Sequence, residues 1–140
     1  MAIEFEGLTE VIERIDKVYD AQGYKAAMGK CCALVERDAK IKAPKDTGAL
    51  RNSIESQVEE SAGEIVGIVF TPLEYAPYVE FGTGLFAENG GRSDVPWHYQ
   101  DDKGNWHKTS GQHPQPYLRP ALAENREKIK NILKESVNNG

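Results

Sequence analysis

The chain has 140 residues, of which 39% are hydrophobic and 28% charged, so it has the composition of a soluble globular protein. This length suffices for one hydrophobic core, and we expect a single domain over residues 1–140. No apolar run approaches the ~18 residues of a transmembrane helix, and the first six residues lack the basic and apolar regions of a signal peptide. The net charge of −5 argues against a surface that follows phosphate groups, because such a surface needs clustered Lys and Arg. We therefore predict no membrane partner and no specific nucleic-acid binding.

Two helices are predicted at the start of the chain. In residues 1–20, apolar residues from Leu8 to Tyr19 follow the i, i+3, i+4, i+7 spacing of one helical face. A longer helix is expected over about residues 24–42, and Pro44 stops it. Its apolar face comprises Tyr24, Ala27, Met28, Cys31, Leu34, Val35 and Ala39. The small residues among them would let another backbone approach closely. Cys31 is expected in the core, with Cys32 at the flank of the helix.

A change of period begins at Leu50, where apolar and polar residues alternate strictly. This alternation predicts a strand over residues 50–58 with one wet face. A turn at residues 61–63 then leads into a more continuously apolar strand over residues 64–70. Together with the long helix, this hairpin forms the expected core, residues 24–83. Four carboxylates are expected on or near the wet side of the hairpin: Glu55, Glu59, Glu60 and Glu64.

Residues 75–83 are expected to be ordered, because four bulky apolar side chains flank one carboxylate, Glu80. These side chains belong to Tyr75, Tyr78, Val79 and Phe81. A buried carboxylate needs a cationic partner, and the candidates are Arg51 and Arg119. Gly82, Thr83 and Gly84 follow, and the glycines allow a sharp turn of the chain. The aromatic side chains have two open interpretations, as core beneath the sheet or as contacts with a neighbouring subunit.

Residues 84–114 are rich in polar residues and glycine, and they are expected to form an extended loop or hairpin arm. Segments 95–100 and 105–109 bracket the sequence Asp-Asp-Lys-Gly, which is typical of a hairpin turn. The large apolar groups of this arm are Trp97, Tyr99 and Trp106. Either these aromatic residues anchor the arm on another protein, or the hairpin folds back and they complete the core of the domain.

The last element is a C-terminal helix, expected within residues 115–137. It starts at a proline-rich sequence, because proline is tolerated in the first turn of a helix. Leu118, Leu122, Ile129, Ile132, Leu133 and Val137 form its apolar stripe. The order of elements predicts an α+β fold, a small antiparallel sheet packed against two or three helices with a long loop or hairpin insertion.

Few residues in the chain suggest catalysis or a cofactor, and we predict no cofactor. His98 and His107 fall on facing strands of the predicted hairpin, where they could meet a metal ion together with nearby aspartates. A small metal-dependent hydrolase or nuclease-like enzyme is therefore the alternative function. A zinc site normally needs three or four ligands, and the aspartates are typical turn residues. The basic residues between Lys40 and Lys45 support a weaker alternative, a nucleic-acid-binding module.

Three sequence blocks, in one order and with similar separations, resemble a known family. Residues 43–54 read Ala-Pro-Lys-Asp-Thr-Gly-Ala-Leu-Arg-Asn-Ser-Ile, residues 75–83 read Tyr-Ala-Pro-Tyr-Val-Glu-Phe-Gly-Thr, and residues 114–121 read Pro-Gln-Pro-Tyr-Leu-Arg-Pro-Ala. The blocks are similar to those of the small tail-completion, or head–tail joining, proteins of long-tailed phages and prophages. The resemblance spans about residues 24–135 and is weakest over residues 84–113.

The resemblance implies a structural assembly protein without enzymatic activity. It implies a ring of six copies in the neck of the virion, between the tail tube or its terminator and the head connector, assembled in the cytoplasm of the bacterial host. In such a ring around DNA, the acidic face of the hairpin could line the channel, or it could be an ordinary solvated face. The residues expected to form interfaces or structural motifs are Asp46, Thr47, Gly48, Leu50, Arg51, Tyr75, Tyr78, Glu80, Phe81, Gly82, Thr83, Trp97, Tyr99, Trp106, Pro116, Tyr117, Leu118, Arg119 and Pro120.

Overall fold

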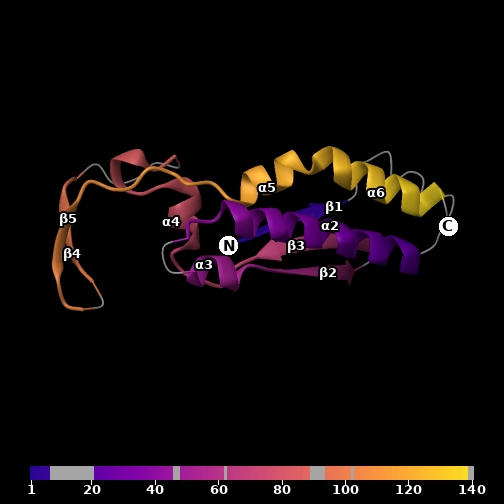
Figure 1. Cartoon of the computed structure of the whole chain (residues 1–140), viewed down its shortest axis with the longest axis horizontal. Coiled ribbons are helices and arrows are strands. Elements are labelled where there is room, and N and C mark those ends of the chain that lie inside the picture. The colour runs from indigo at the N-terminus through magenta and orange to yellow at the C-terminus, as the bar shows by residue number, and fades with distance from the viewer. Residues whose placement is uncertain (7–20, 46–47, 62, 89–93, 102, 139–140) are drawn as a thin grey trace.

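The computed structural model describes residues 1–6, 21–45, 48–61, 63–88, 94–101 and 103–138. Within these ranges, helices lie against a three-stranded antiparallel sheet of order β1-β3-β2, and a narrow arm extends from one end of this body (Figure 1). The strands of the sheet are β1 (Ala2–Glu6), β2 (Glu55–Ser61) and β3 (Glu64–Phe70). The helices are α2 (Ala21–Lys42), α3 (Ala49–Ser53), α4 (Ala76–Phe81), α5 (Leu118–Glu124) and α6 (Arg126–Asn138). The arm carries the 3-10 helix η1 (Gly84–Phe86) and the hairpin of β4 (Trp97–Gln100) and β5 (Trp106–Thr109). The predicted α+β class is confirmed.

Helix α2 packs across the sheet and also contacts α5 and α6. Its predicted apolar face is buried, apart from the half-buried Leu34. The helix lies close to β3 at Gly67, where an added Cβ would be 2.7 Å from the Cys32 Sγ atom and 2.8 Å from the ring of Phe5. Cys32 was expected at the flank, and this expectation is wrong, because the sheet covers it as completely as the core covers Cys31. Within the described ranges, every helix is too short or too polar to traverse a lipid bilayer.

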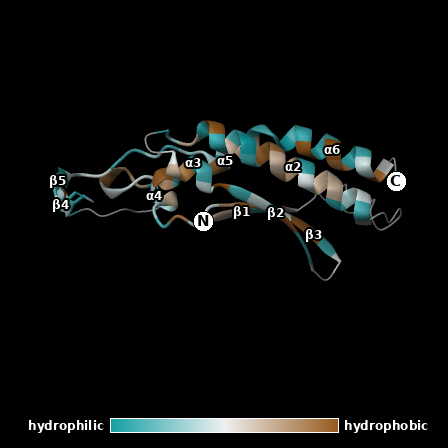
Figure 2. Cartoon of the chain, turned by 60° about the horizontal axis from the view of Figure 1, so that its bottom comes forward, coloured by the Kyte–Doolittle hydropathy of each residue, from teal (hydrophilic) through white to brown (hydrophobic). Residues whose placement is uncertain are grey.

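The two faces of the sheet differ because successive residues of a strand point to opposite sides. Ile3, Phe5, Val58 and Ile65 pack against the helical core. Their neighbours in sequence point away from it, and Figure 2 shows the helices on one side of the sheet. Of the four carboxylates expected on the wet side, Glu55, Glu59 and Glu64 take this outer face. Glu60 is an exception, because it points towards the helices and its Oε2 atom lies 3.0 Å from the Nζ atom of Lys25 in α2.

The N-terminal strand is a correction to the sequence analysis. Ala2–Glu6 was assigned to the helical segment of residues 1–20, yet it forms β1 and pairs antiparallel with β3. The reason is tertiary, because alternation over so few residues becomes informative only when β3 offers an edge to pair with. The helix expected between residues 7 and 20 lies outside the described residues.

Helix α3 is a second correction, because residues 50–53 were expected to begin a strand and β2 starts only at Glu55. Gly48 begins this short helix with a positive φ of 74°, and its carbonyl accepts a 2.9 Å hydrogen bond from the Asn52 amide. At the other end, the Ser53 hydroxyl donates to the Leu50 carbonyl at 2.6 Å and lies 2.7 Å from the Thr71 hydroxyl. These local hydrogen bonds compete with the strand that the alternation predicts.

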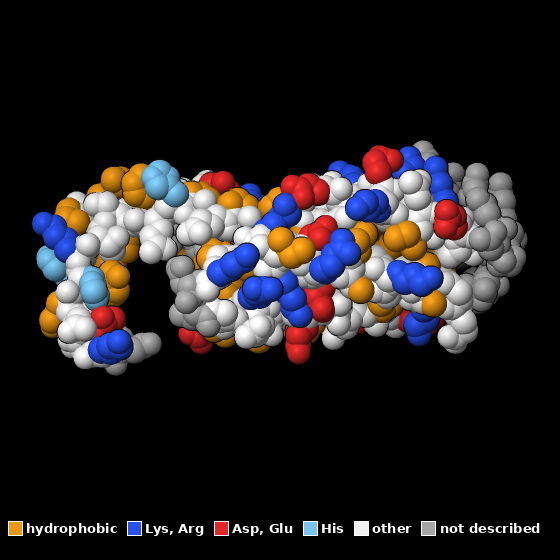
Figure 3. Space-filling model, viewed as in Figure 1, with side chains coloured by type: hydrophobic (Ala, Val, Ile, Leu, Met, Phe, Trp, Pro, Cys, Tyr) orange, Lys and Arg blue, Asp and Glu red, His pale blue; other side chains and the backbone are white. Residues whose placement is uncertain are grey.

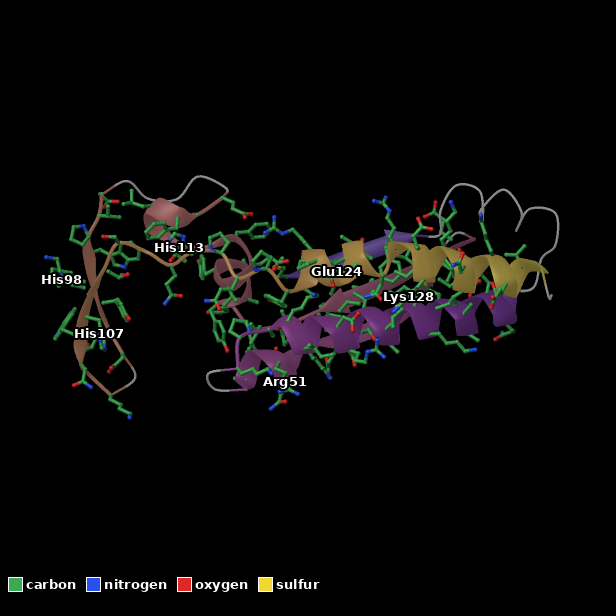
Figure 4. The ribbon with its side chains drawn as sticks, turned by 45° about the horizontal axis from the view of Figure 1, so that its top comes forward. Arg51, His98, His107, His113, Glu124 and Lys128 are labelled. Atoms are coloured by element: carbon green, nitrogen blue, oxygen red, sulfur yellow. The ribbon has the colours of Figure 1, made fainter. Side chains whose placement is uncertain are left out.

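The predicted C-terminal helix is divided into α5 and α6 at Asn125. The Asn125 side chain is buried, and its amide donates to Asp38 Oδ2 at 2.6 Å and to the Ala121 carbonyl at 2.7 Å. The hydrogen bond from Asn125, followed by that from Arg37, holds the pKa of Asp38 below its ordinary value. Nearby, Lys42 Nζ of α2 lies 2.7 Å from the Oε2 atom of Glu124 in α5 (Figure 4). Polar contacts with α2 therefore fix the position of this break.

Candidate functional site

The candidate site begins at α4, which gives residues 75–81 a buried face and an exposed face. Pro77 lies in the first turn, where its missing N–H costs no hydrogen bond. Ala76 and Glu80 point inward and are fully buried. Tyr75 and Tyr78 are 42% and 61% exposed. The core interpretation is therefore wrong for Tyr75 and Tyr78, and contact of these tyrosines with a neighbouring subunit stays a prediction.

Glu80 links this helix to the start of α5. Its carboxylate accepts a 2.6 Å hydrogen bond from the Tyr117 amide and a 2.7 Å hydrogen bond from the Arg119 amide. The Nε atom of Arg119 lies 3.5 Å from Glu80 Oε1. The prediction of a cationic partner is confirmed for Arg119, whereas Arg51 is exposed on α3 and takes no part (Figure 4). The two backbone donors are the contacts that sequence reasoning did not foresee.

The guanidinium of Arg119 extends the same network to the arm. It lies over the Phe81 ring at 4.5 Å from the centroid and donates from Nη2 to the Glu80 carbonyl at 3.0 Å. Its Nη2 atom also lies 2.8 Å from Glu88 Oε2. Sequence analysis missed Glu88, because a carboxylate in a Gly-rich loop gives no pattern that would single it out. Arg119 thereby joins α4, α5 and the arm.

Tyr117 completes the link from within the core. Its side chain is fully buried, and the hydroxyl donates to the Ala76 carbonyl at 3.4 Å. Burial and then the nearby Glu80 carboxylate raise the pKa of the Tyr117 hydroxyl, which stays protonated and able to donate. Leu118 is equally buried, while Pro116 is exposed and Pro120 half-buried in the first turn of α5.

The first sequence block, residues 43–54, takes no part in the contacts between Glu80 and residues 117–119. Asp46 and Thr47 lie outside the described residues, and Gly48 starts α3 as described above. Leu50 is buried in the same hydrophobic core as Ala76 and Tyr117. The structure thus brings the second and third blocks together through Glu80, and it connects the first block to them through the core.

The root of the arm is formed by two chain segments held side by side. The Thr83 amide donates to the Gln112 carbonyl at 2.9 Å, and the Leu85 amide donates to the Ser110 carbonyl at 3.0 Å. Gly84 has a φ of +63°, and a Cβ added there would collide with the Ser110 carbonyl oxygen. A side chain is therefore excluded where the two segments cross. This pairing positions the hairpin away from the body (Figure 1).

The predicted hairpin at the end of the arm is confirmed, with β4 and β5 paired so that Tyr99 is opposite His107 and Gln100 is opposite Trp106. Trp97, Tyr99 and His107 share one face, whereas Trp106 lies on the other. Tyr99 stacks on His107 with a centroid distance of 5.2 Å, and His107 Nε2 lies 2.8 Å from Asp101 Oδ2. This hydrogen bond, with that of the Asn105 amide, lowers the pKa of Asp101. Tyr99 is 44% exposed and Trp106 69% exposed, so aromatic groups are displayed on both faces.

The same register bears on the suggested metal site. His98 and His107 lie on facing strands, as expected, but His98 pairs with Lys108 and points to the face opposite His107 (Figure 4). His113 lies elsewhere, with its ring tilted against that of Phe86 at 3.9 Å between centroids. In the described part of the chain, no group of three or more His, Cys, Asp or Glu residues could hold a metal ion. The proposed pair of His98 and His107 therefore does not form one ligand set.

A pocket of about 380 Å³ lies between β1 and the helices α5 and α6. Its lining is mainly apolar and consists of Ile3, Phe5, Arg119, Leu122, Ala123, Arg126 and Ile129. Such a lining can accept an apolar side chain, with the guanidinium group of Arg126 at its edge. Sequence analysis missed it because it did not predict β1.

Comparison with known proteins identifies the family. The model of the HK97-gp10-like family, described as a candidate tail component of bacteriophage HK97, matches residues 7–82, more than half of the chain. The chain belongs to the HK97-gp10-like family. No curated protein and no solved structure matches it. The match includes the first sequence block, the second block as far as Gly82, and α2, α3, β2, β3 and α4. The arm and the third block lie beyond it, so the link from Glu80 to Tyr117 and Arg119 joins the matched region to the remainder of the chain. Membership in a phage tail family supports a structural role in the virion.

Proposed function

We propose that this phage tail component completes the end of the tail and joins it to the head connector as a ring of six copies. The observation that carries this proposal is the arm, which presents exposed aromatic side chains at a distance from the folded body. Its partners are further copies of the chain, the tail tube or its terminator, and the head connector. Its place is the neck of the virion, after assembly in the cytoplasm of the bacterial host.

The exposure of Trp106 and Tyr99 supports a docking role for the arm. Leaving a large aromatic side chain in water forgoes about 1.5–3 kcal/mol of burial free energy. Trp and Tyr are also the side chains that most often anchor protein interfaces. In the space-filling view, the arm bends back and leaves an open notch between its hairpin and the body (Figure 3). The hairpin therefore does not cover the core, and its aromatic residues stay available to a partner.

The root of the arm supports positioning rather than free movement. The paired segments at Gly84 and the contact between Arg119 and Glu88 hold the first residues of the arm against α4 and α5. An arm with a fixed root loses less conformational entropy on docking than a free loop does. The network around Glu80 therefore serves the assembly by setting the direction of the arm.

Replacing residues 89–109 with a short Gly-Ser linker tests the proposal, because it removes the hairpin and keeps the paired root. We expect the shortened protein to unfold cooperatively near the parental temperature. In a complementation assay, it should fail to restore infectious particles in a phage that lacks the gene. A protein that folds and restores particles as well as the parent would contradict the docking role, and one that fails to fold would show that the arm belongs to the core.

Two point variants give a matched control. Trp106→Ser removes the exposed ring on one face of the hairpin, and it should reduce particle formation without changing thermal stability. His98→Ser together with Lys108→Ser alters polar side chains on that same face, and these changes should leave both properties at the parental level. Equal losses in the two variants would mean that the general surface of the hairpin matters and not its aromatic anchor.

A further inference from the structure

The outer face of the sheet has an apolar stripe that the fold buries only in part. Val66, Ile68 and Phe70 alternate along the central strand β3 and point away from the helices. None of the three belongs to the hydrophobic core cluster of the described residues. Ile68 is only 8% exposed, and Val66 and Phe70 are half-buried. The helices of the described ranges lie on the opposite side of the sheet, and a partly exposed apolar stripe of this kind is a surface that a partner can cover.

The charged residues of the three strands that form this sheet are all acidic. The strands β1, β2 and β3 contain six glutamates and no Lys or Arg. Glu4, Glu55, Glu59 and Glu64 share the outer face with the apolar stripe. Two sheets of this kind cannot stack on one another without bringing carboxylates together, so a twofold contact through this face is disfavoured.

The outward face of α2 has the opposite character. The helix contains five Lys or Arg residues and two acidic residues, and cationic side chains gather over it in the space-filling view (Figure 3). Arg37 and Lys40 pair with the neighbouring Asp38 and Glu36, whereas Lys30 is exposed and has no ion pair in the described part of the chain.

The shape of this helix face also suits a flat partner. Ala26 and Ala33 are exposed, and a Cβ added at Gly29 would meet no atom within 4 Å. Ile41 adds a large apolar side chain that is 58% exposed. Small residues on a helix allow a second surface to come close, as Gly67 does on the other side of α2.

We infer that the outer sheet face of one copy packs on the outward face of α2 in the next copy. This inference rests on the proposed self-assembly and assigns the surfaces that carry it. Carboxylates beside the apolar stripe then meet Lys30 and Arg37, and the stripe is covered by the small residues and Ile41. Because the two surfaces differ, the contact is head-to-tail, and repeating it produces a ring when the rotation closes.

Charge reversal on the two surfaces tests this contact. In one variant, Glu55→Lys and Glu59→Lys reverse the sheet face, and in a second variant, Lys30→Glu and Arg37→Glu reverse the helix face. Self-association is measured by sedimentation velocity at low and at physiological salt, with circular dichroism to verify folding. Each variant alone should associate at least about tenfold more weakly than the parent, since attraction becomes repulsion. Glu127→Lys with Glu135→Lys, two exposed carboxylates of α6 on the helical side of the sheet, should have no such effect.

Mixing the two variants gives the decisive result. In a mixture, the reversed sheet of one variant faces the reversed helix of the other, and their unmodified surfaces also match. The equimolar mixture should therefore recover association to within about threefold of the parent, and higher salt should weaken it. Three results would overturn the inference. The mixture could associate no more strongly than either variant alone, the reversed variants could assemble like the parent, or the parent could stay monomeric at low salt.

Two further outcomes separate this inference from the proposed function. Infectious particles formed without the gene would refute the role in tail completion. They would not affect the contact between sheet and helix, because sedimentation of the purified variants tests that contact separately. An assembled sheet-reversed variant that gains retention on DNA would place the outer sheet face at the channel, and it would overturn the contact proposed here.

Discussion

Replacing Glu80 with Ala should lower the free energy of unfolding by about 4 kcal/mol, and the hydrogen bonds give the reason. The carboxylate is fully buried and is the acceptor for the Tyr117 amide at 2.6 Å and the Arg119 amide at 2.7 Å. Truncation leaves two N–H groups without an acceptor, at about 1–3 kcal/mol each. The guanidinium contributes less, because its Nε atom is 3.5 Å from Glu80 Oε1 and the Arg119 side chain is 42% exposed.

The matched variant is Arg119→Ala, which removes the guanidinium and keeps both amides. This variant should lower the free energy of unfolding by about 1–2 kcal/mol, because it loses the contact with Phe81 and the hydrogen bond to the Glu80 carbonyl. Both variants are measured by urea unfolding followed by far-ultraviolet circular dichroism. Tryptophan fluorescence is unsuitable, because Trp97 and Trp106 both lie in the arm. Equal losses of unfolding free energy in the two variants would refute the reasoning, since the guanidinium would then be the main partner of Glu80. A loss within experimental error for Glu80→Ala would show that the carboxylate is solvated.

Three other predictions concern the arm root, the helix break and the core. Gly84→Ala should open the root and expose the arm to protease, because its Cβ would meet the Ser110 carbonyl. Gly63→Ala shares the positive φ but meets no atom within 4 Å, so it should leave the arm protected; equal cleavage of both variants would refute this explanation. Asp38 has a lowered pKa, so its stabilisation is present above its ordinary value of 3.8 and is lost as pH falls through the folded-state pKa. Asp38→Asn should therefore reduce unfolding free energy at neutral pH and lose this effect in strong acid, and a difference independent of pH would contradict it. Burial raises the pKa of the Cys31 thiol to about 12, so a thiol reagent at mildly alkaline pH should label it slowly until urea is added, and rapid labelling of the native protein would count against a buried thiol.

The elements that sequence analysis predicted well are those with a sustained period or a strong local signal. Helix α2 carries its apolar residues at helical spacing over 22 residues, and the turn residues between β4 and β5 mark the arm hairpin. The partner of Glu80 was also within reach, since a carboxylate among aromatic side chains must find a donor. Arg51 and Arg119 were the two candidates, because each lies in one of the other two sequence blocks.

The elements that were missed depend on contacts that no local pattern records. Strand β1 needs the edge of β3, and the break at Asn125 needs the Asp38 carboxylate of α2. Helix α3 forms because Gly48 and Ser53 bond to the backbone around them, which outweighs the alternation of the sequence. The contact of Glu88 with Arg119 and the pocket beside β1 could not be predicted for the same reason, since each forms only where segments distant in sequence meet.

The central claim is that the arm of this tail component contacts another molecule in the assembled virion, and cross-linking of intact particles tests it most directly. Lys103 and Lys108 are exposed on the hairpin and accept an amine-reactive cross-linker. Particles assembled from a mixture of isotopically labelled and unlabelled subunits distinguish links within one chain from links between chains. We predict that both lysines link to another subunit or to a neighbouring tail or connector protein. Links from these lysines only to the body of their own chain would contradict the account.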